Sequence, residues 1–108
     1  MDEARVHQAV ADALRVSGVP RRLEILRTIA AGGPLSPSVF GRDSGTPLRE
    51  SAYHFRFLRD AGLLVLARVE LSSGTAQHFY DLGPVARGIV EALPALERAV
   101  AAQQRAAA

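Results

Sequence analysis

Residues 36–62 read SPSVFGRDSGTPLRESAYHFRFLRDAG and hold two helix patterns with a short break between them. Ser36 is a favourable N-cap for a short helix, which Ser44-Gly45 would end. Thr46-Pro47 then supplies an N-cap and a proline at the first helical position, which predicts a second helix from 47 to about 61. Gly62 would end that helix. The stretch therefore predicts a short helix, a tight turn and a longer helix.

Immediately downstream, the apolar pattern changes to strict alternation. Every second residue from Val65 to Leu71 is apolar, which predicts a strand with one buried face. Residues 72–75, Ser-Ser-Gly-Thr, form a turn in which Gly74 can take a positive φ. Residues 76–82 then predict the return strand of a β-hairpin.

Helical stripes of apolar residues flank this centre, over residues 2–16 and 84–104. Pro20 begins a further helix that stops at Gly32-Gly33-Pro34. Pro94 would kink the last helix, because proline removes a backbone donor. A domain this small leaves part of each terminal stripe uncovered, so we expect the two terminal helices to mediate dimerisation. The expected interface residues are Val6, Val10, Leu14, Ile89, Leu93, Leu96 and Val100.

The order is helix, helix, helix-turn-helix, hairpin, helix, which predicts a mainly α fold with a small β-hairpin wing (α+β), a winged helix-turn-helix. With 108 residues and 48% hydrophobic content, the chain fits one domain over 1–108. Within it we expect terminal helices at 2–16 and 84–104, the helix-turn-helix at 36–61 and the wing at 64–82.

Composition narrows the classes of function. The formal net charge is only +2, and all thirteen basic residues are arginine, a bias that with the many alanines indicates a GC-rich bacterial genome. No cysteine is present, which excludes disulfides and thiol catalysis and fits a reducing cytoplasm. The acidic start, Met1-Asp2-Glu3, and the lack of an apolar run near ~18 residues predict a soluble, cytoplasmic chain without membrane contact.

The 47–61 helix is the element expected to contact double-stranded DNA, because recognition helices reach base edges mainly through their N-terminal half. At 100° per residue, Leu48, Ala52, Phe55 and Leu58 form its inward face. Polar residues on the outward side of a helix usually form only a solvated surface, but their place before a wing favours the DNA interpretation. The expected DNA-binding residues are Thr46, Arg49, Glu50 and Tyr53, flanked by His54 and Arg56, with Arg42 and Arg68 as backbone clamps.

Residues 51–63, SAYHFRFLRDAGL, resemble the recognition-helix signature of ArsR-type (arsenic repressor-like) winged-helix regulators. The segments RLEIL at 22–26, LSP at 35–37 and GTAQHFY at 74–80 resemble that family too, so the resemblance covers about 5–100. It implies a dimer formed through the first and last helices, with the 47–61 helix in the major groove and Tyr53, His54 and Arg56 among the DNA contacts. Ala52 stands where the family often has serine. Gly41 replaces a more usual alanine, which would loosen the short helix.

Many relatives sense metals through cysteines or through ligands on the last helix, where this chain has only Glu91 and Glu97. Its histidines, His7, His54 and His78, fall on three separate elements, so we expect no metal site and no cofactor. No motif for catalysis is present, and we expect no enzyme.

The sequence thus predicts a DNA-binding transcription regulator, a homodimeric repressor of operator DNA with an unidentified small-molecule or protein effector. The alternative is a winged-helix interaction or dimerisation module that does not bind DNA. The cationic surface from Arg49 to Arg56 distinguishes the two, because an interaction module does not need it.

Overall fold

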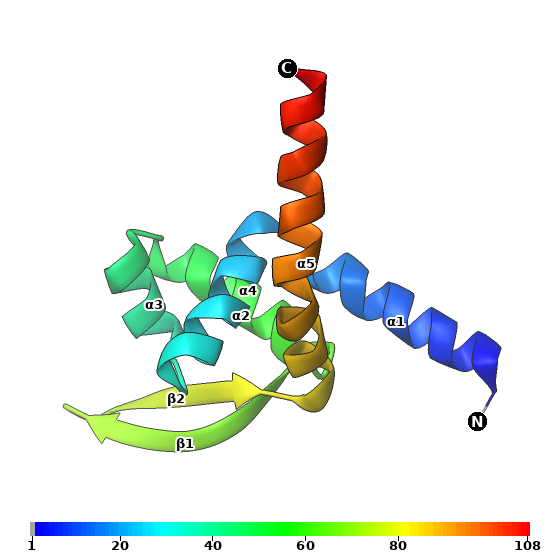
Figure 1. Ribbon diagram of the computed structural model, residues 1–108. Coiled ribbons are helices and arrows are strands. Elements are labelled where there is room, and N and C mark those ends of the chain that lie inside the picture. The colour runs from blue at the N-terminus through cyan, green and yellow to red at the C-terminus, as the bar shows by residue number, and fades with distance from the viewer. Residues whose placement is uncertain (1) are drawn as a thin grey trace.

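The computed structural model describes residues 2–108, which form five helices and one two-stranded antiparallel sheet in the order of a winged helix-turn-helix (Figure 1). The elements are α1 (Glu3–Ser17), α2 (Pro20–Gly32), α3 (Pro37–Ser44), α4 (Leu48–Asp60), β1 (Leu64–Ser72), β2 (Thr75–Leu82) and α5 (Pro84–Ala107). The predicted mainly α class with a hairpin wing is therefore confirmed.

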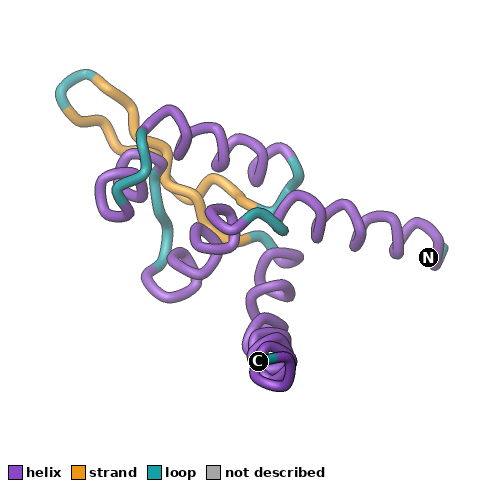
Figure 2. The backbone as a smooth tube through the Cα atoms, turned by 90° about the horizontal axis from the view of Figure 1, so that it is seen from above, coloured by secondary structure: helices purple, strands orange, loops and turns teal. Residues whose placement is uncertain are grey.

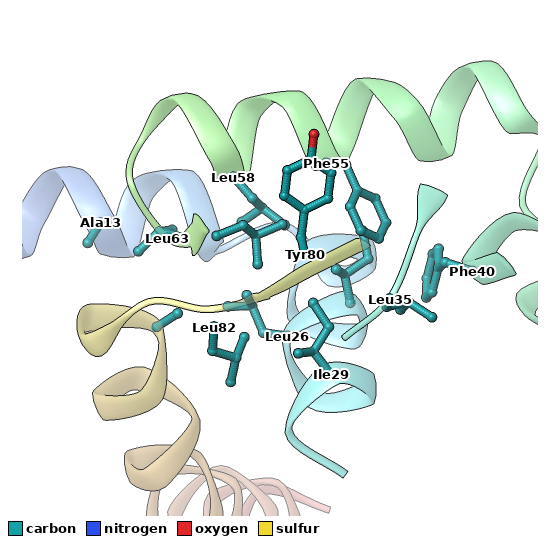
Figure 3. Packing of buried hydrophobic residues seen from close by; sticks show 13 residues of the cluster. Ala13, Leu26, Ile29, Leu35, Phe40, Phe55, Leu58, Leu63, Tyr80 and Leu82 are labelled. Atoms are coloured by element: carbon teal, nitrogen blue, oxygen red, sulfur yellow. The ribbon is translucent and has the colours of Figure 1, made fainter. Parts of the chain in front are cut away.

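The core lies where α2, α4 and the base of the hairpin meet (Figure 3). Phe55 and Leu58 of α4 face Leu26 and Ile29 of α2, and the ring of Tyr80 on β2 lies 6.1 Å from that of Phe55. Burial of each such aliphatic or aromatic side chain stabilises the fold by about 1.5–3 kcal/mol. These contacts hold α4 from behind and leave its opposite side free.

The turn between α3 and α4 is tight and depends on small residues. Gly41 is buried, and a Cβ atom added there would lie 2.8 Å from the carbonyl oxygen of Thr46. The expectation that Gly41 loosens α3 is therefore wrong, because glycine is the residue that lets this corner close. The hydroxyl of Ser51 reinforces the corner by donating a 2.7 Å hydrogen bond to the carbonyl oxygen of Pro37.

The hairpin projects from the body (Figures 1 and 2) and, contrary to the sequence expectation, buries neither face of β1 beyond Leu64. Leu66 pairs with Tyr80 and Arg68 with Phe79, so a bulge at residue 67 shifts the alternation. At the tip, Ser73 and Gly74 both have positive φ, as a two-residue hairpin turn of type I′ requires. Hydrogen bonds between Leu35 and Tyr80 attach the base of the hairpin to the segment before α3.

The helices α1 and α5 extend away from the body in different directions (Figures 1 and 2). The radius of gyration is 15.6 Å, whereas a compact domain of this length is expected near 13 Å. Helix α5 continues through Pro94 without interruption, and an ion pair between Arg27 and Glu97 holds it to α2.

Candidate nucleic-acid interface

The outward side of α4 carries two guanidinium groups without an acidic partner. Arg49 and Arg56 are both exposed, and within residues 2–108 neither forms an ion pair. They are two helical turns apart and therefore share one side of α4. Tyr53, which is 44% exposed, lies between them along the helix, and Glu50 is exposed nearby. This side of α4 can present charge and a hydroxyl group to a polyanion.

Two residues expected on this surface are buried instead. Thr46 is 3% exposed, and its Oγ1 lies 2.7 Å from Oγ of Ser44 inside the turn. Pro47 occupies the N-cap position of α4, so the expected capping role of Thr46 is wrong as well. His54 is 8% exposed and faces α2. Neither side chain lies on the outward face in the single chain.

The buried side of α4 is rotated by about one residue from the predicted one. Leu48 and Ala52, expected inside, are exposed, whereas Ser51 and His54 are buried beside Phe55 and Leu58. The helical periodicity alone favours the apolar residues, but a buried polar group is stable when it is hydrogen-bonded. The hydrogen bonds of Ser51 and His54 meet that condition.

Arg22 on α2 is the residue that sequence reasoning missed. Its Nε–H donates a 3.1 Å hydrogen bond to Nδ1 of His54, and Nη1 donates one of 3.0 Å to the carbonyl oxygen of Val16. Its guanidinium carbon lies 4.6 Å from the ring centroid of Phe57 and 5.9 Å from that of Tyr53. The resemblance of residues 22–26 to the family was the only signal that pointed to this position.

The aromatic pair on α4, Tyr53 and Phe57, packs beside that arginine. The rings of Tyr53 and Phe57 lie 4.7 Å apart, one helical turn from each other. Phe57 remains 42% exposed on the side of α4 that faces Arg22, away from the hairpin. The Tyr53 ring therefore contacts Phe57 and Arg22 and is otherwise exposed to solvent.

Arg42 and Arg68, the two residues expected to contact the DNA backbone, each form an ion pair within the chain. Nε of Arg42 lies 3.1 Å from Oδ1 of Asp43, and Nε of Arg68 lies 3.1 Å from Oε2 of Glu70. The guanidinium of Arg68 also lies 4.1 Å from the ring centroid of Phe79 on β2. Both ion pairs are exposed, so each costs little to break, but both reduce the positive charge that the turn and the hairpin offer.

A second candidate surface is the apolar side of the projecting helices. Val10 and Leu14 of α1 are 50% and 54% exposed, and Leu96 of α5 is 59% exposed. Val6 and Val100 continue the two stripes. Arg5, Val6, Ala9, Val10 and Val85 line a hollow of about 380 Å³ on this side.

Two of the residues expected at a dimer interface, Ile89 and Leu93, instead face the interior of the same chain. Leu93 is buried, and Ile89 is half-buried against the core cluster. Helix α2 and strand β2 pack against one side of α5. The ion pair between Arg27 and Glu97 also joins α5 to α2. Only the outer part of the predicted stripe is exposed.

In the part of the chain that the structure describes, no group of three or more histidine, aspartate or glutamate side chains is placed to hold a metal ion. Within residues 2–108, no helix combines the length and the apolar character needed to cross a bilayer.

Comparison with protein-family models finds no match, and neither does comparison with curated protein sequences. Among solved structures, a crystal structure of an ArsR family transcriptional regulator superimposes with a TM-score of 0.57. The similarity covers 86% of this chain and 90% of that one, at 18% sequence identity. The predicted resemblance to ArsR-type proteins is therefore confirmed at the level of the fold, which is the winged helix-turn-helix.

Proposed function

We propose that this chain is a sequence-specific DNA-binding transcription regulator in which α4 enters the major groove. One observation carries the proposal. The exposed side of α4, which is the second helix of the helix-turn-helix, holds the unpaired guanidinium groups of Arg49 and Arg56. Arginine forms bidentate hydrogen bonds with guanine in the major groove, and a phenol such as that of Tyr53 can bond to a phosphate or a base.

We further infer that the regulator is a homodimer formed through α1 and α5. The stripes that contain Val10, Leu14 and Leu96 are unpartnered in the single chain, and helices with an exposed apolar stripe are stabilised by a partner. A two-fold dimer presents two α4 helices, which bind half-sites about 34 Å apart when they lie on successive turns of one DNA face. Doubling also compensates for the modest net charge of +2.

In this proposal the dimer represses transcription in the cytoplasm by occupying promoter DNA, and a small molecule or another protein acts as effector. A reporter gene placed behind the selected operator tests the direction of regulation. Lower expression in the presence of the protein supports repression, and higher expression contradicts it.

The second candidate is a winged-helix module that binds another protein. The ring of Phe57 favours it, because this ring remains 42% exposed although it contacts Arg22 and Tyr53, and aromatic side chains are enriched at protein interfaces. Against it stand the two unpaired arginines on the same helix, which a protein-binding surface of this kind does not need.

The deciding experiment is selection from random duplexes, followed by an electrophoretic shift with the recovered sequence and with the DNA upstream of the chain's own gene. The wild type should recover a two-fold symmetric sequence. A variant with Arg49→Ala and Arg56→Ala should lose binding, whereas Arg98→Ala on α5, which also removes one positive charge, should retain it. Absence of any enriched sequence, with equal weak binding to all duplexes, would favour the protein-binding module.

A further inference from the structure

A cleft of about 340 Å³ lies between α4, the N-terminus of α3 and strand β2. Its polar lining includes Arg56 and Arg59 of α4, His78 of β2 and Ser38 of α3. The rings of Phe55 and Tyr80 also line it, and Figure 3 shows these two rings close together beside α4. No residue of the helix-turn-helix or the hairpin that lines this cleft carries a carboxylate.

The cationic groups of the cleft differ in how they are engaged. Arg59 donates to Oδ1 of Asp60 from Nε and Nη2, at 3.2 and 3.0 Å. The Tyr80 hydroxyl and the Asp60 carboxylate beside Arg59 raise the pKa of its guanidinium. Arg56, by contrast, forms no ion pair within residues 2–108. Its five N–H donors are therefore available to an acceptor that enters the cleft.

On the α3 side of the cleft, the N-terminus of the helix offers one free hydrogen-bond donor. The Ser36 side chain accepts from the backbone N–H of Val39 at 3.1 Å, and the N–H of Phe40 bonds to the Ser36 carbonyl. The N–H of Ser38, one residue before Val39, has no hydrogen-bond partner in residues 2–108. The first turn of a helix favours negative charge, so this side of the cleft has the same preference as the arginines.

A contact between α3 and the hairpin fixes the width of the cleft. Ser36 Oγ donates to Oε1 of Gln77 at 3.1 Å, which ties the hairpin to the N-terminus of α3. His78 follows Gln77 directly and lines the cleft from β2. Hydrogen-bond donors from α3, α4 and β2 therefore surround the same cleft.

We propose that this cleft is an oxyanion site that binds a phosphate group through Arg56, Arg59, His78 and the backbone N–H of Ser38. Tetrahedral phosphate accepts several hydrogen bonds at once and matches guanidinium geometry. The phosphate has two possible sources. One is the DNA backbone beside the groove that α4 enters, which rests on the proposed function; the other is a small phosphorylated molecule, which would bind independently of DNA.

The test titrates inorganic phosphate into the full chain at constant ionic strength, with chloride as the compensating ion, and follows ¹H–¹⁵N spectra. Saturable shifts are expected at the Arg56 side-chain N–H, at the Ser38 amide and at His78, with a dissociation constant on the order of 1 mM. Arg56→Gln and, separately, His78→Gln should weaken binding at least about fivefold. The control Arg98→Gln should leave it unchanged. Shifts that are linear, spread over the surface or equally reduced in Arg98→Gln would overturn the proposal.

Addition of the selected duplex separates the two sources. If the backbone supplies the phosphate, saturating duplex abolishes the phosphate-induced shifts, and Arg56→Gln lowers the salt dependence of duplex binding by about one unit. If the source is a small molecule, phosphate and duplex bind together. Phosphate binding without any duplex binding would support the cleft and contradict the proposed function. Duplex binding without localised phosphate shifts would contradict the cleft alone.

Discussion

The Nε–H of Arg22 on α2 donates a 3.1 Å hydrogen bond to Nδ1 of His54 on α4, 32 positions further along the chain. Since an arginine is always protonated, Nδ1 of His54 must be the acceptor, which assigns the neutral tautomer with its proton on Nε2. Nε2 in turn lies 3.7 Å from Oε1 of Glu50, too far for a strong hydrogen bond. The proposed recognition helix is therefore fastened to α2 by a buried polar contact that requires an uncharged imidazole.

Replacement of Arg22 should destabilise the fold. Arg22→Met retains an apolar stem but leaves Nδ1 of His54 and the carbonyl oxygen of Val16 without their donor. We expect a loss of about 1–3 kcal/mol in the free energy of unfolding, measured by urea denaturation. Arg98→Met on exposed α5 is the matched control and should change stability by less than about 0.5 kcal/mol. Equal effects of the two substitutions would contradict a structural role for the buried contact.

Stability should depend on pH through His54. Burial, followed by the charge of Arg22, lowers the pKa of His54 below its ordinary value of 6.5, against the opposing effect of Glu50; Arg21 also lowers it. The unfolded chain then binds the proton more readily than the folded one. The contribution of neutral His54 is therefore complete above 6.5 and is lost as the pH falls through the lowered pKa.

Urea denaturation between about pH 7.5 and 5.5 measures this dependence. His54→Gln offers an amide oxygen to Arg22 and cannot titrate, so its stability should fall less over that interval. His7→Gln on exposed α1 serves as the control and should behave as the wild type. A wild-type stability that rises as the pH is lowered would show that the sign is wrong.

Gly41→Ala should destabilise the helix-turn-helix, because the new Cβ would lie 2.8 Å from the Thr46 carbonyl oxygen. Relief of this overlap requires α3 and α4 to separate, at an expected cost of about 1–3 kcal/mol in thermal or urea unfolding. Gly32→Ala, where an added Cβ meets nothing within 4 Å, should be neutral or slightly stabilising. If Gly41→Ala is also neutral, the corner is more adaptable than these distances indicate.

Charge placed on the projecting helices should prevent dimerisation. Leu14→Glu and Leu96→Glu each put a carboxylate into the proposed apolar interface, and we expect the wild type to sediment as a dimer and each variant as a monomer. Burial of one leucine contributes about 1.5–3 kcal/mol, and two-fold symmetry doubles the effect. Leu71→Glu makes the same substitution on the hairpin, where the side chain is 80% exposed, and should leave the dimer intact. A wild type that sediments only at 11.5 kDa would contradict the proposal.

Arg49 and Arg68 should contribute differently to DNA binding. Arg49→Ala is expected to cost about 1–3 kcal/mol per half-site on the selected operator and to weaken base preference. Arg68→Ala should weaken specific and scrambled duplexes alike and reduce the salt dependence by at most about one unit, since Glu70 already neutralises part of its charge. Salt titrations by fluorescence anisotropy, on variants shown to remain dimeric, measure both. An unchanged ratio of operator to scrambled affinity in Arg49→Ala would show that the reading surface lies elsewhere.

The order of the elements was determined by the sequence alone. Ser36 caps α3 as predicted, with its Oγ accepting from the N–H of Val39, and Pro20 and Pro84 begin α2 and α5. Signals of this kind are local: a cap, a proline or a run of apolar residues acts on neighbours within a turn or two. Such signals can therefore be recognised in the sequence without knowledge of the fold.

The burial of individual polar side chains was decided only by tertiary structure. His54 and Thr46 resemble exposed residues by periodicity, yet their hydrogen bonds to Arg22 and Ser44 place them inside. Strand β1 shows the reverse, because its alternation predicts a buried face, whereas within residues 2–108 no element buries β1 beyond Leu64. A side chain is buried only when a segment distant in sequence supplies a partner or a covering surface, and such long-range contacts leave no periodic mark in the sequence.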